Sequence, residues 1–238
     1  MPHADGARWT DLPGGWDALH TRERFPSSNA WGFPEVLPLA ATINPTWPLL
    51  SYAARDDRGH LQERSIAHGF LDDYRLERIW NRPRAALTRI RRFRAALAPD
   101  LSIYRDWPLV CNLWNTYRAR WIVAYWQHHG VNVIPVANWS DAASYRWSFA
   151  GLPRRSMIAI AVPGHRDRLT RTLFADGYLA MLDLLDPTIV LVYGALPFRS
   201  SRAIEHPQDL MALRRLNERH RRTPAAATAR GCKASARP

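Results

Sequence analysis

The chain has 238 residues, 47% of them hydrophobic, and its 33 basic and 21 acidic residues give a formal net charge of +12 and a pI near 10.7. This length and composition suit one globular domain with a sizeable core, and no run of about 18 apolar residues is present to span a bilayer. The two cysteines, Cys111 and Cys232, form neither a disulfide framework nor a metal-ligand spacing, which predicts a reduced, cytoplasmic protein.

The two ends of the chain differ in composition from its middle. Residues 1–35 are rich in Pro, Gly, Trp and charge without periodicity, and we expect them to form an irregular N-terminal extension. The domain is predicted to cover residues 36–222, and it begins with an apolar run at 37–43, whose flanking prolines favour an edge strand or an extended loop. Residues 223–238 lack an apolar stripe and are expected to form a basic disordered tail.

Short apolar runs alternate with helical runs through the middle of the chain. The predicted strands are residues 66–71, 101–104, 131–136, 157–162 and 188–193. The predicted helices are residues 73–97, divided by Pro83 near Arg82, then 109–129 with Gly130 as its stop, 166–185 before Pro187, and 208–222. The strands start roughly 26 to 35 residues apart, the length of a strand with one crossover helix. The fold class is therefore α/β, a single domain with a mainly parallel sheet of about five to six strands, open or barrel-like.

Polar residues follow the predicted strands, and in parallel α/β folds the carboxyl ends of strands converge on one rim. The candidate catalytic residues at this rim are Asp72, Asp106, Asp141 and His165. The candidate substrate-binding residues are Asn138, Trp139 and Tyr193 at the same rim, with Asn115 and Arg118 on the helix at 109–129. Carboxylates and a histidine in this arrangement suit acid–base chemistry or a divalent cation.

Each of these residues also has a simpler interpretation. Helix capping would account for Asp72 or Asp73 and for Asp141, and Asp106 stands where the next helix begins, with Pro108 in its first turn. His165 lies in a turn where an exposed histidine is common. Asn115 and Arg118 are one helical turn apart, so Arg118 is either a clamp for an anion or half of a structural ion pair.

The arginines point to polyanionic partners, because each neutralised phosphate releases counterions. The candidate nucleic-acid-binding residues are Arg84, Arg91 and Arg92 in the predicted helix after Pro83, and Arg214, Arg215, Arg221 and Arg222 near the C-terminus. The alternative is a solvated basic surface, since Lys233 is the single lysine and a GC-rich genome favours arginine codons.

An ordered series of short motifs resembles the uncharacterised domain of unknown function 4417 family over about residues 70–198. The matching residues include Phe70, Asp72, Asp73, Tyr74, Arg75, Pro99, Asp100, Asn115, Tyr117, Arg118, Trp139, Asp141, Gly177, Tyr178, Tyr193 and Gly194. The resemblance implies a bacterial, phage or plasmid protein whose activity is not established, and mobile-element association favours a nucleic-acid role. The chain departs from the family pattern at Leu101, where Phe is usual, and at Ala150, where Asp is common.

Three functional hypotheses remain open. The first is a mobile-element protein that engages DNA, RNA or a nucleic-acid-processing protein partner. The second is a hydrolase that uses the acidic rim, either a nuclease with Mg²⁺ or Mn²⁺ as its cofactor or a glycosidase-like enzyme with Trp107, Trp139 and Trp147 stacking on sugars. The third is a non-catalytic interaction scaffold. P-loop, dinucleotide-binding, zinc-protease and serine-hydrolase motifs are all absent from the sequence.

Overall fold

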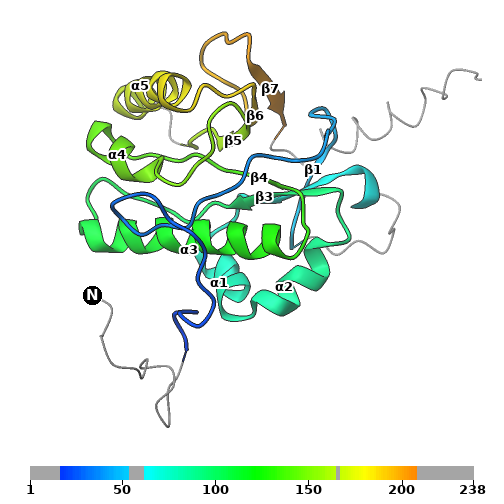
Figure 1. Ribbon diagram of the computed structural model, residues 1–238. Helices are drawn as coiled ribbons and strands as arrows, with labels where there is room; N and C mark the ends of the chain where they lie inside the picture. Colours follow the sequence, from blue (N-terminus) through cyan, green and yellow to red (C-terminus); the bar gives the residue numbers. More distant parts are fainter. Residues whose placement is uncertain (1–16, 54–61, 165–166, 208–238) are drawn as a thin grey trace, which may run out of the picture.

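A computed structural model describes residues 17–53, 62–164 and 167–207 (Figure 1). Strands occupy the middle of the molecule, with α1, α2 and α3 on one side of them and α5 on the other (Figure 1). This arrangement confirms the predicted α/β class.

Two parallel sheets form the framework. The first has the order β1 (Leu49–Ser51), β2 (Ile66–Gly69), β3 (Ala95–Pro99) and β4 (Val133–Ile134). The second has the order β5 (Met157–Ala161), β6 (Ile189–Tyr193) and β7 (Ala203–His206). A parallel bridge between Val136 and Ala159 connects them. No ladder joins β7 to β1 among the described strands, so the sheet is open.

Helices connect most of the strands. They are α1 (Asp73–Asn81), α2 (Pro83–Ile90), α3 (Leu109–His128), α4 (Tyr145–Ser148) and α5 (Arg168–Leu185), with 3₁₀ turns η2 (Gln62–Arg64) and η3 (Ala142–Ser144). Pro83 stands at the first position of α2, where its missing N–H costs nothing. Gly130 follows α3 with a φ of +78°, the left-handed conformation that ends the helix. No helix of the described ranges is long and apolar enough to cross a membrane.

Alternate residues of β5 and β6 point to opposite faces and join two different cores. Ile158, Ile160, Val190 and Val192 pack in one cluster with α5. Met157, Ala159 and Leu191 face away from α5 and join the larger core, which contains α1, α2, α3 and the first sheet. The face of the second sheet that α5 does not cover therefore packs in the same core as the first sheet. Within this contact the ring of Tyr193 of β6 stacks on Phe70 with 4.8 Å between ring centroids.

The N-terminal segment explains why α3 is buried on nearly every side. Residues 17–48 contain turns and bends but no helix or strand. The indole Nε1 of Trp121 donates to the carbonyl oxygen of Glu23 at 2.9 Å. Gln127 accepts from the backbone of Leu37 at 2.9 Å and donates to it at 2.8 Å. This irregular chain takes the place of a helix layer over α3, so the helix needs no polar face.

The expected strand at 101–104 is wrong, and so is the expectation of helix up to Leu97. The chain turns after α2, and the small residues Ala95–Pro99 form the fully buried strand β3 instead. Alanine has low β propensity, but its small side chain lets α3 lie close against the strand. Residues 101–104 form a loop, because Asn112 of α3 bonds both the N–H and the carbonyl oxygen of Tyr104, at 2.9 and 2.8 Å.

Other differences lie at the edges of the sheets. Strands β1 and β7 were not predicted, and the run at 37–43 is an extended loop without strand pairing. The predicted helices 109–129 and 166–185 correspond to α3 and α5, and β2, β4, β5 and β6 lie within predicted strands. The expected helix at 208–222 and the tail at 223–238 lie outside the described residues.

Candidate functional site

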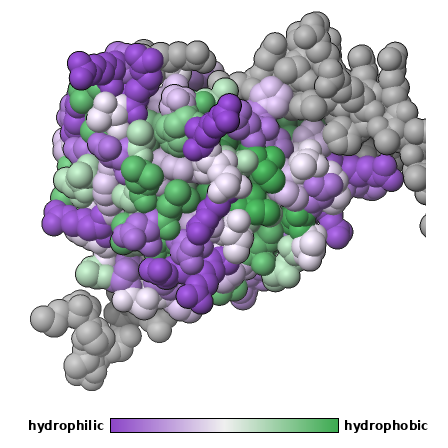
Figure 2. Space-filling view, turned by 90° about the horizontal axis from the view of Figure 1, so that it is seen from above, coloured by the Kyte–Doolittle hydropathy of each residue, from purple (hydrophilic) through white to green (hydrophobic). Residues whose placement is uncertain are grey.

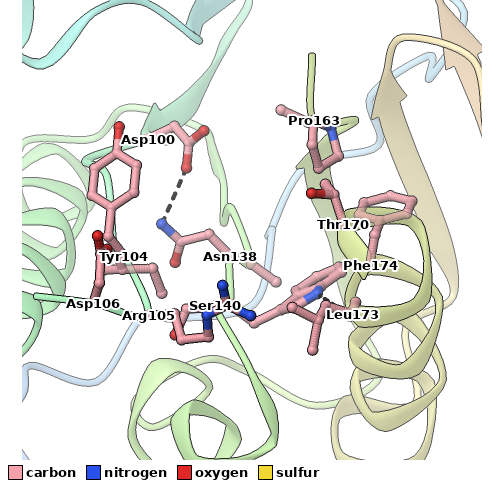
Figure 3. Close-up of a pocket in the computed structure, with 14 residues that line it drawn as sticks. Asp100, Tyr104, Arg105, Asp106, Asn138, Ser140, Pro163, Thr170, Leu173 and Phe174 are labelled. Carbon is pink, nitrogen blue, oxygen red and sulfur yellow. Dashed lines mark hydrogen bonds between the residues drawn. The ribbon is translucent and has the colours of Figure 1, made fainter. Parts of the chain in front are cut away.

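A cavity of about 400 Å³ opens at the carboxyl rim of the sheets, between the loop after β3 and the start of α5 (Figure 3). Asp100 and Tyr104 stand on one side of this cavity and Thr170 and Phe174 on the other, with Asn138 between them (Figure 3). The residues come from the ends of β3, β4 and β5 and from the first turns of α5. This is where open α/β sheets usually bind ligands.

Asp100 is the residue that the altered position of β3 brings to the rim. It follows the last residue of β3 directly, and its Oδ1 accepts a hydrogen bond of 3.2 Å from Nδ2 of Asn138. The same amide group donates to the carbonyl oxygen of Leu101 at 3.0 Å. Asn138 therefore ties the segment after β4 to the loop after β3, and it holds the Asp100 carboxyl at the cavity wall.

Burial raises the pKa of Asp100 to about 7, and the negative charge of Asp73 acts in the same direction. The hydrogen bond from Asn138 opposes this rise because it favours the ionised form. Asp100 still lines the cavity and keeps partial contact with solvent. A carboxyl group that exists in both forms near neutral pH can donate or accept a proton or a hydrogen bond.

A chain of polar contacts holds the loop after β3. Asp73 at the start of α1 accepts from the backbone N–H of Ser102 at 3.1 Å and from its hydroxyl at 3.0 Å. Asn115 of α3 donates to the Ser102 carbonyl oxygen at 2.6 Å, and its own Oδ1 accepts from Arg118 at 2.6 Å. Arg118 also pairs with Glu77 of α1, with 2.5 Å between Nη1 and Oε1. Asn115 and Arg118 thus hold the loop against α1 and α3, and neither of them lines the cavity.

The structure separates the predicted catalytic carboxylates. Asp106 lines the cavity, and Asp72 lines a neighbouring pocket that also contains Asp100. Asp141 caps η3, where its Oδ1 accepts from the backbone N–H of Ser144 at 3.2 Å. His165 lies outside the described residues. Within the described ranges, no three His, Cys, Asp or Glu side chains come together to hold a metal ion.

Trp139 forms a rigid wall of the cavity. Its Nε1 donates to the carbonyl oxygen of Leu173 at 3.2 Å, and its ring stacks on Phe174 with 5.5 Å between centroids. The indole packs directly on Gly177 of α5, where an added Cβ would come within 2.1 Å of Nε1. The glycine is therefore required by the position of the indole.

The predicted substrate-binding residue Tyr193 lies beside a buried histidine. Its ring contacts His68 of β2 at 4.7 Å between centroids, and burial raises the pKa of its hydroxyl. Burial lowers the pKa of His68 to about 4, so His68 is neutral at neutral pH. Its Nδ1 faces the backbone N–H of Phe70 at 3.3 Å, which assigns Nδ1 as the acceptor and Nε2 as the protonated nitrogen.

A second feature is a groove beside α1 and α2 that collects arginines. It is lined by Tyr52, Tyr74, Arg75, Arg78, Arg82 and Arg89, with small alanines between them. Arg75, Arg78 and Arg82 are exposed, and none of the ion pairs within the described ranges involves them. The guanidinium of Arg89 lies 5.5 Å above the Tyr52 ring. We call this surface the arginine groove.

The arginines predicted to bind nucleic acid lie elsewhere. Arg84, Arg91 and Arg92 are exposed but do not line the arginine groove, and Arg91 donates to the carbonyl oxygen of His129 at 2.8 Å. The C-terminal arginines 214, 215, 221 and 222 lie outside the described residues. The sequence did contain a signal for the groove, because Arg75, Arg78 and Arg82 follow a spacing of three and four residues.

The arginine groove adjoins the rim. Arg75 lines both the groove and the pocket that contains Asp72 and Asp100. That pocket in turn shares Asp100 and Ala161 with the cavity. The arginine groove, the pocket with Asp72 and the cavity with Asp100 are therefore neighbours along one side of the molecule.

Comparison with known proteins identifies the family. The model of the domain of unknown function DUF4417 matches residues 25–208. The chain belongs to this family. The matched range begins before residue 70 and ends after residue 198, so residues 25–48 of the N-terminal segment are part of the family domain.

The DUF4417 chain is also similar to two mycobacteriophage proteins. It is 36% identical over 197 residues to the Gene 1 protein of Mycobacterium phage D29, covering 81% of this chain and 71% of that protein. It is 37% identical over 198 residues to the Gene 1 protein of Mycobacterium phage L5, covering 80% and 82%. No solved structure matches the chain. The predicted family and its phage association are confirmed.

Proposed function

We propose that this DUF4417 protein binds nucleic acid through the arginine groove. The observation that carries the proposal is the gathering of Arg75, Arg78, Arg82 and Arg89 along one groove of α1 and α2. Guanidinium groups bind phosphate oxygens through paired N–H donors, and a row of them follows a phosphate backbone. A net charge of +12 supports the attraction over a longer range.

The tyrosines of the groove favour a single strand as the ligand. Tyr74 lines the groove and is 74% exposed, and Tyr52 lines it with the guanidinium of Arg89 over its ring. Single-strand binding sites combine a basic groove with aromatic rings on which bases stack. Duplexes keep their bases stacked inside, so they gain nothing from these rings.

The hydrolase hypothesis is a second candidate, and the observation that favours it is Asp100. A carboxyl group with a pKa of about 7 in a rim cavity suits a general acid or base. Among the described residues no three His, Cys, Asp or Glu side chains group to hold a metal ion, so this candidate rests on acid–base chemistry at Asp100.

Fluorescence anisotropy with labelled single-stranded DNA, single-stranded RNA and duplex DNA, over a series of salt concentrations, tests the proposed function. Replacing Arg75, Arg78 and Arg82 together with alanine should weaken single-strand binding at least about tenfold and lower the salt slope by about 2 to 3. A variant with Arg154, Arg168 and Arg199 replaced removes the same charge from exposed positions outside the groove. Equal weakening in both variants would mean that binding depends on net charge alone and would reject the groove.

A further inference from the structure

We infer that the rim cavity between Asp100 and Trp139 receives one unstacked base of a strand that lies in the arginine groove. The inference rests on the proposed function and names the group that the cavity takes. Pockets for small ligands range from about 300 to 1,000 Å³, and this cavity of about 400 Å³ falls near the lower end. A single nucleobase with part of its sugar is a ligand of this class.

The charges of the two surfaces favour the phosphates of a strand in the arginine groove and its neutral base in the cavity. Asp72, Asp100 and Asp106 lie at the cavity or its adjoining pocket, where Arg75 and Arg105 also lie, so no excess of positive charge collects there and a phosphate gains less than in the groove. The arginine groove offers the opposite charge to the phosphates. Arg75 lines both the arginine groove and the pocket that adjoins the cavity, so it lies between the two surfaces. A nucleotide whose phosphate stays at Arg75 places its neutral base toward Asp100.

The polar groups of the cavity match the edge of a base. Asp100 and Asn138 present a carboxyl and an amide side by side, joined by a hydrogen bond of 3.2 Å. Carboxyl and amide side chains are the groups that proteins use to read the donors and acceptors of bases. Ser140 and Thr170 add hydroxyl groups around the same space (Figure 3).

Aromatic side chains line two sides of the cavity, and Tyr104 is the one among them with the most exposed ring for a base to contact. Trp139 and Phe174 stack on each other and form one wall, while Tyr104, 47% exposed, stands across the cavity. Base stacking on an aromatic side chain contributes about 1 to 3 kcal/mol per base. The wall is fixed in advance, since Trp139 packs on Gly177 and donates to Leu173.

Saturation-transfer NMR with the four ribonucleosides tests the inference, because a nucleoside carries no phosphate and does not need the arginine groove. Signal transfer to base protons is expected in the wild-type protein and in the variant with Arg75, Arg78 and Arg82 replaced by alanine. Asn138→Ala should weaken nucleoside binding about tenfold, because it removes the amide oxygen that can accept from a base and the donor that holds the Asp100 carboxyl at the cavity wall. Asp100→Asn, which keeps the shape of the side chain, should change the order of preference among the nucleosides.

The outcomes separate the inference from the proposed function. Strand binding by the wild-type protein without nucleoside binding would overturn the inference and leave the proposed function standing. Nucleoside binding that Asn138→Ala and Asp100→Asn both leave unchanged would also overturn it, since the base would then lie elsewhere. Nucleoside binding without strand binding would reject the proposed function. It would also reject the inference that the base in the cavity belongs to a bound strand.

Discussion

Replacing Asp100 with asparagine is expected to stabilise the fold, and the gain should grow with pH. The pKa of Asp100 is raised from 3.8 to about 7, so the folded protein keeps a proton that the unfolded chain releases. The free energy of unfolding of the wild-type protein therefore falls as the pH rises from about 4 to about 7, and the loss is complete above that range. Asparagine has no charge to bury and its side-chain oxygen still accepts from Asn138, so the variant does not lose this stability as the pH rises.

The size of the effect follows from the shift. One pKa unit corresponds to about 1.4 kcal/mol, which sets an upper limit of about 4 kcal/mol at high pH. Because Asp100 keeps partial contact with solvent, screening reduces this value, and we expect about 2 kcal/mol. Functional sites often contain a group that lowers the free energy of unfolding, and the Asp100 carboxyl is such a group.

Equilibrium urea unfolding of the wild-type protein and Asp100→Asn measures the effect. The stability gained by the variant at about pH 8.5 should exceed the gain at about pH 5.5 by about 1 kcal/mol. Asp183→Asn changes an exposed carboxylate of α5 and is the matched control. A variant that gains nothing at the higher pH, or loses stability there, would show that Asp100 is ionised and well compensated, and our account of the cavity would be wrong.

Three further predictions concern groups around the two cores. Gly177→Ala should lower the free energy of unfolding by more than about 2 kcal/mol, measured by urea unfolding, because its Cβ would overlap the indole of Trp139; a neutral effect would contradict the packing. The pKa of His68 is lowered from 6.5 to about 4, so stability should fall as the pH drops through this range, and NMR should find a neutral imidazole at about pH 5.5 rather than a midpoint near 6.5. Arg120→Ala should cost about 3 kcal/mol in the same unfolding assay, because the buried guanidinium satisfies two backbone carbonyl oxygens near the end of α4; a loss under about 1 kcal/mol would contradict this role.

Local signals in the sequence were sufficient to predict the long helices and the strands β5 and β6. Helix α5 begins at a side-chain cap, with Asp167 accepting from the backbone N–H of Thr170 at 2.9 Å, and it ends before Pro187. Strands β5 and β6 are continuous apolar runs rich in Ile and Val. Such features are decided within a few residues of the chain, so a sequence can predict them.

Features that depend on distant contacts were missed. Strand β3 is mostly alanine, and it forms because it lies between β2 and β4 under α3 rather than because alanine prefers extended backbone. Because the strand was predicted at residues 101–104 rather than 95–99, the carboxylate expected after its end was Asp106 instead of Asp100. The arginine groove was overlooked for a similar reason, because the helix after Pro83 has the denser run of arginines while the groove is made by the faces of two helices together.

Photo-crosslinking tests the central claim most directly, that the folded domain binds a strand along the arginine groove with a base in the rim cavity. A single-stranded oligonucleotide with 4-thiouracil at successive positions would be irradiated with the full chain, and the crosslinked residues would be mapped by mass spectrometry. We expect crosslinks at Tyr52 or Tyr74 along the groove and at Tyr104 or Trp139 in the cavity. Crosslinks found only on the exposed face of α5, or only in residues 208–238, would contradict the claim.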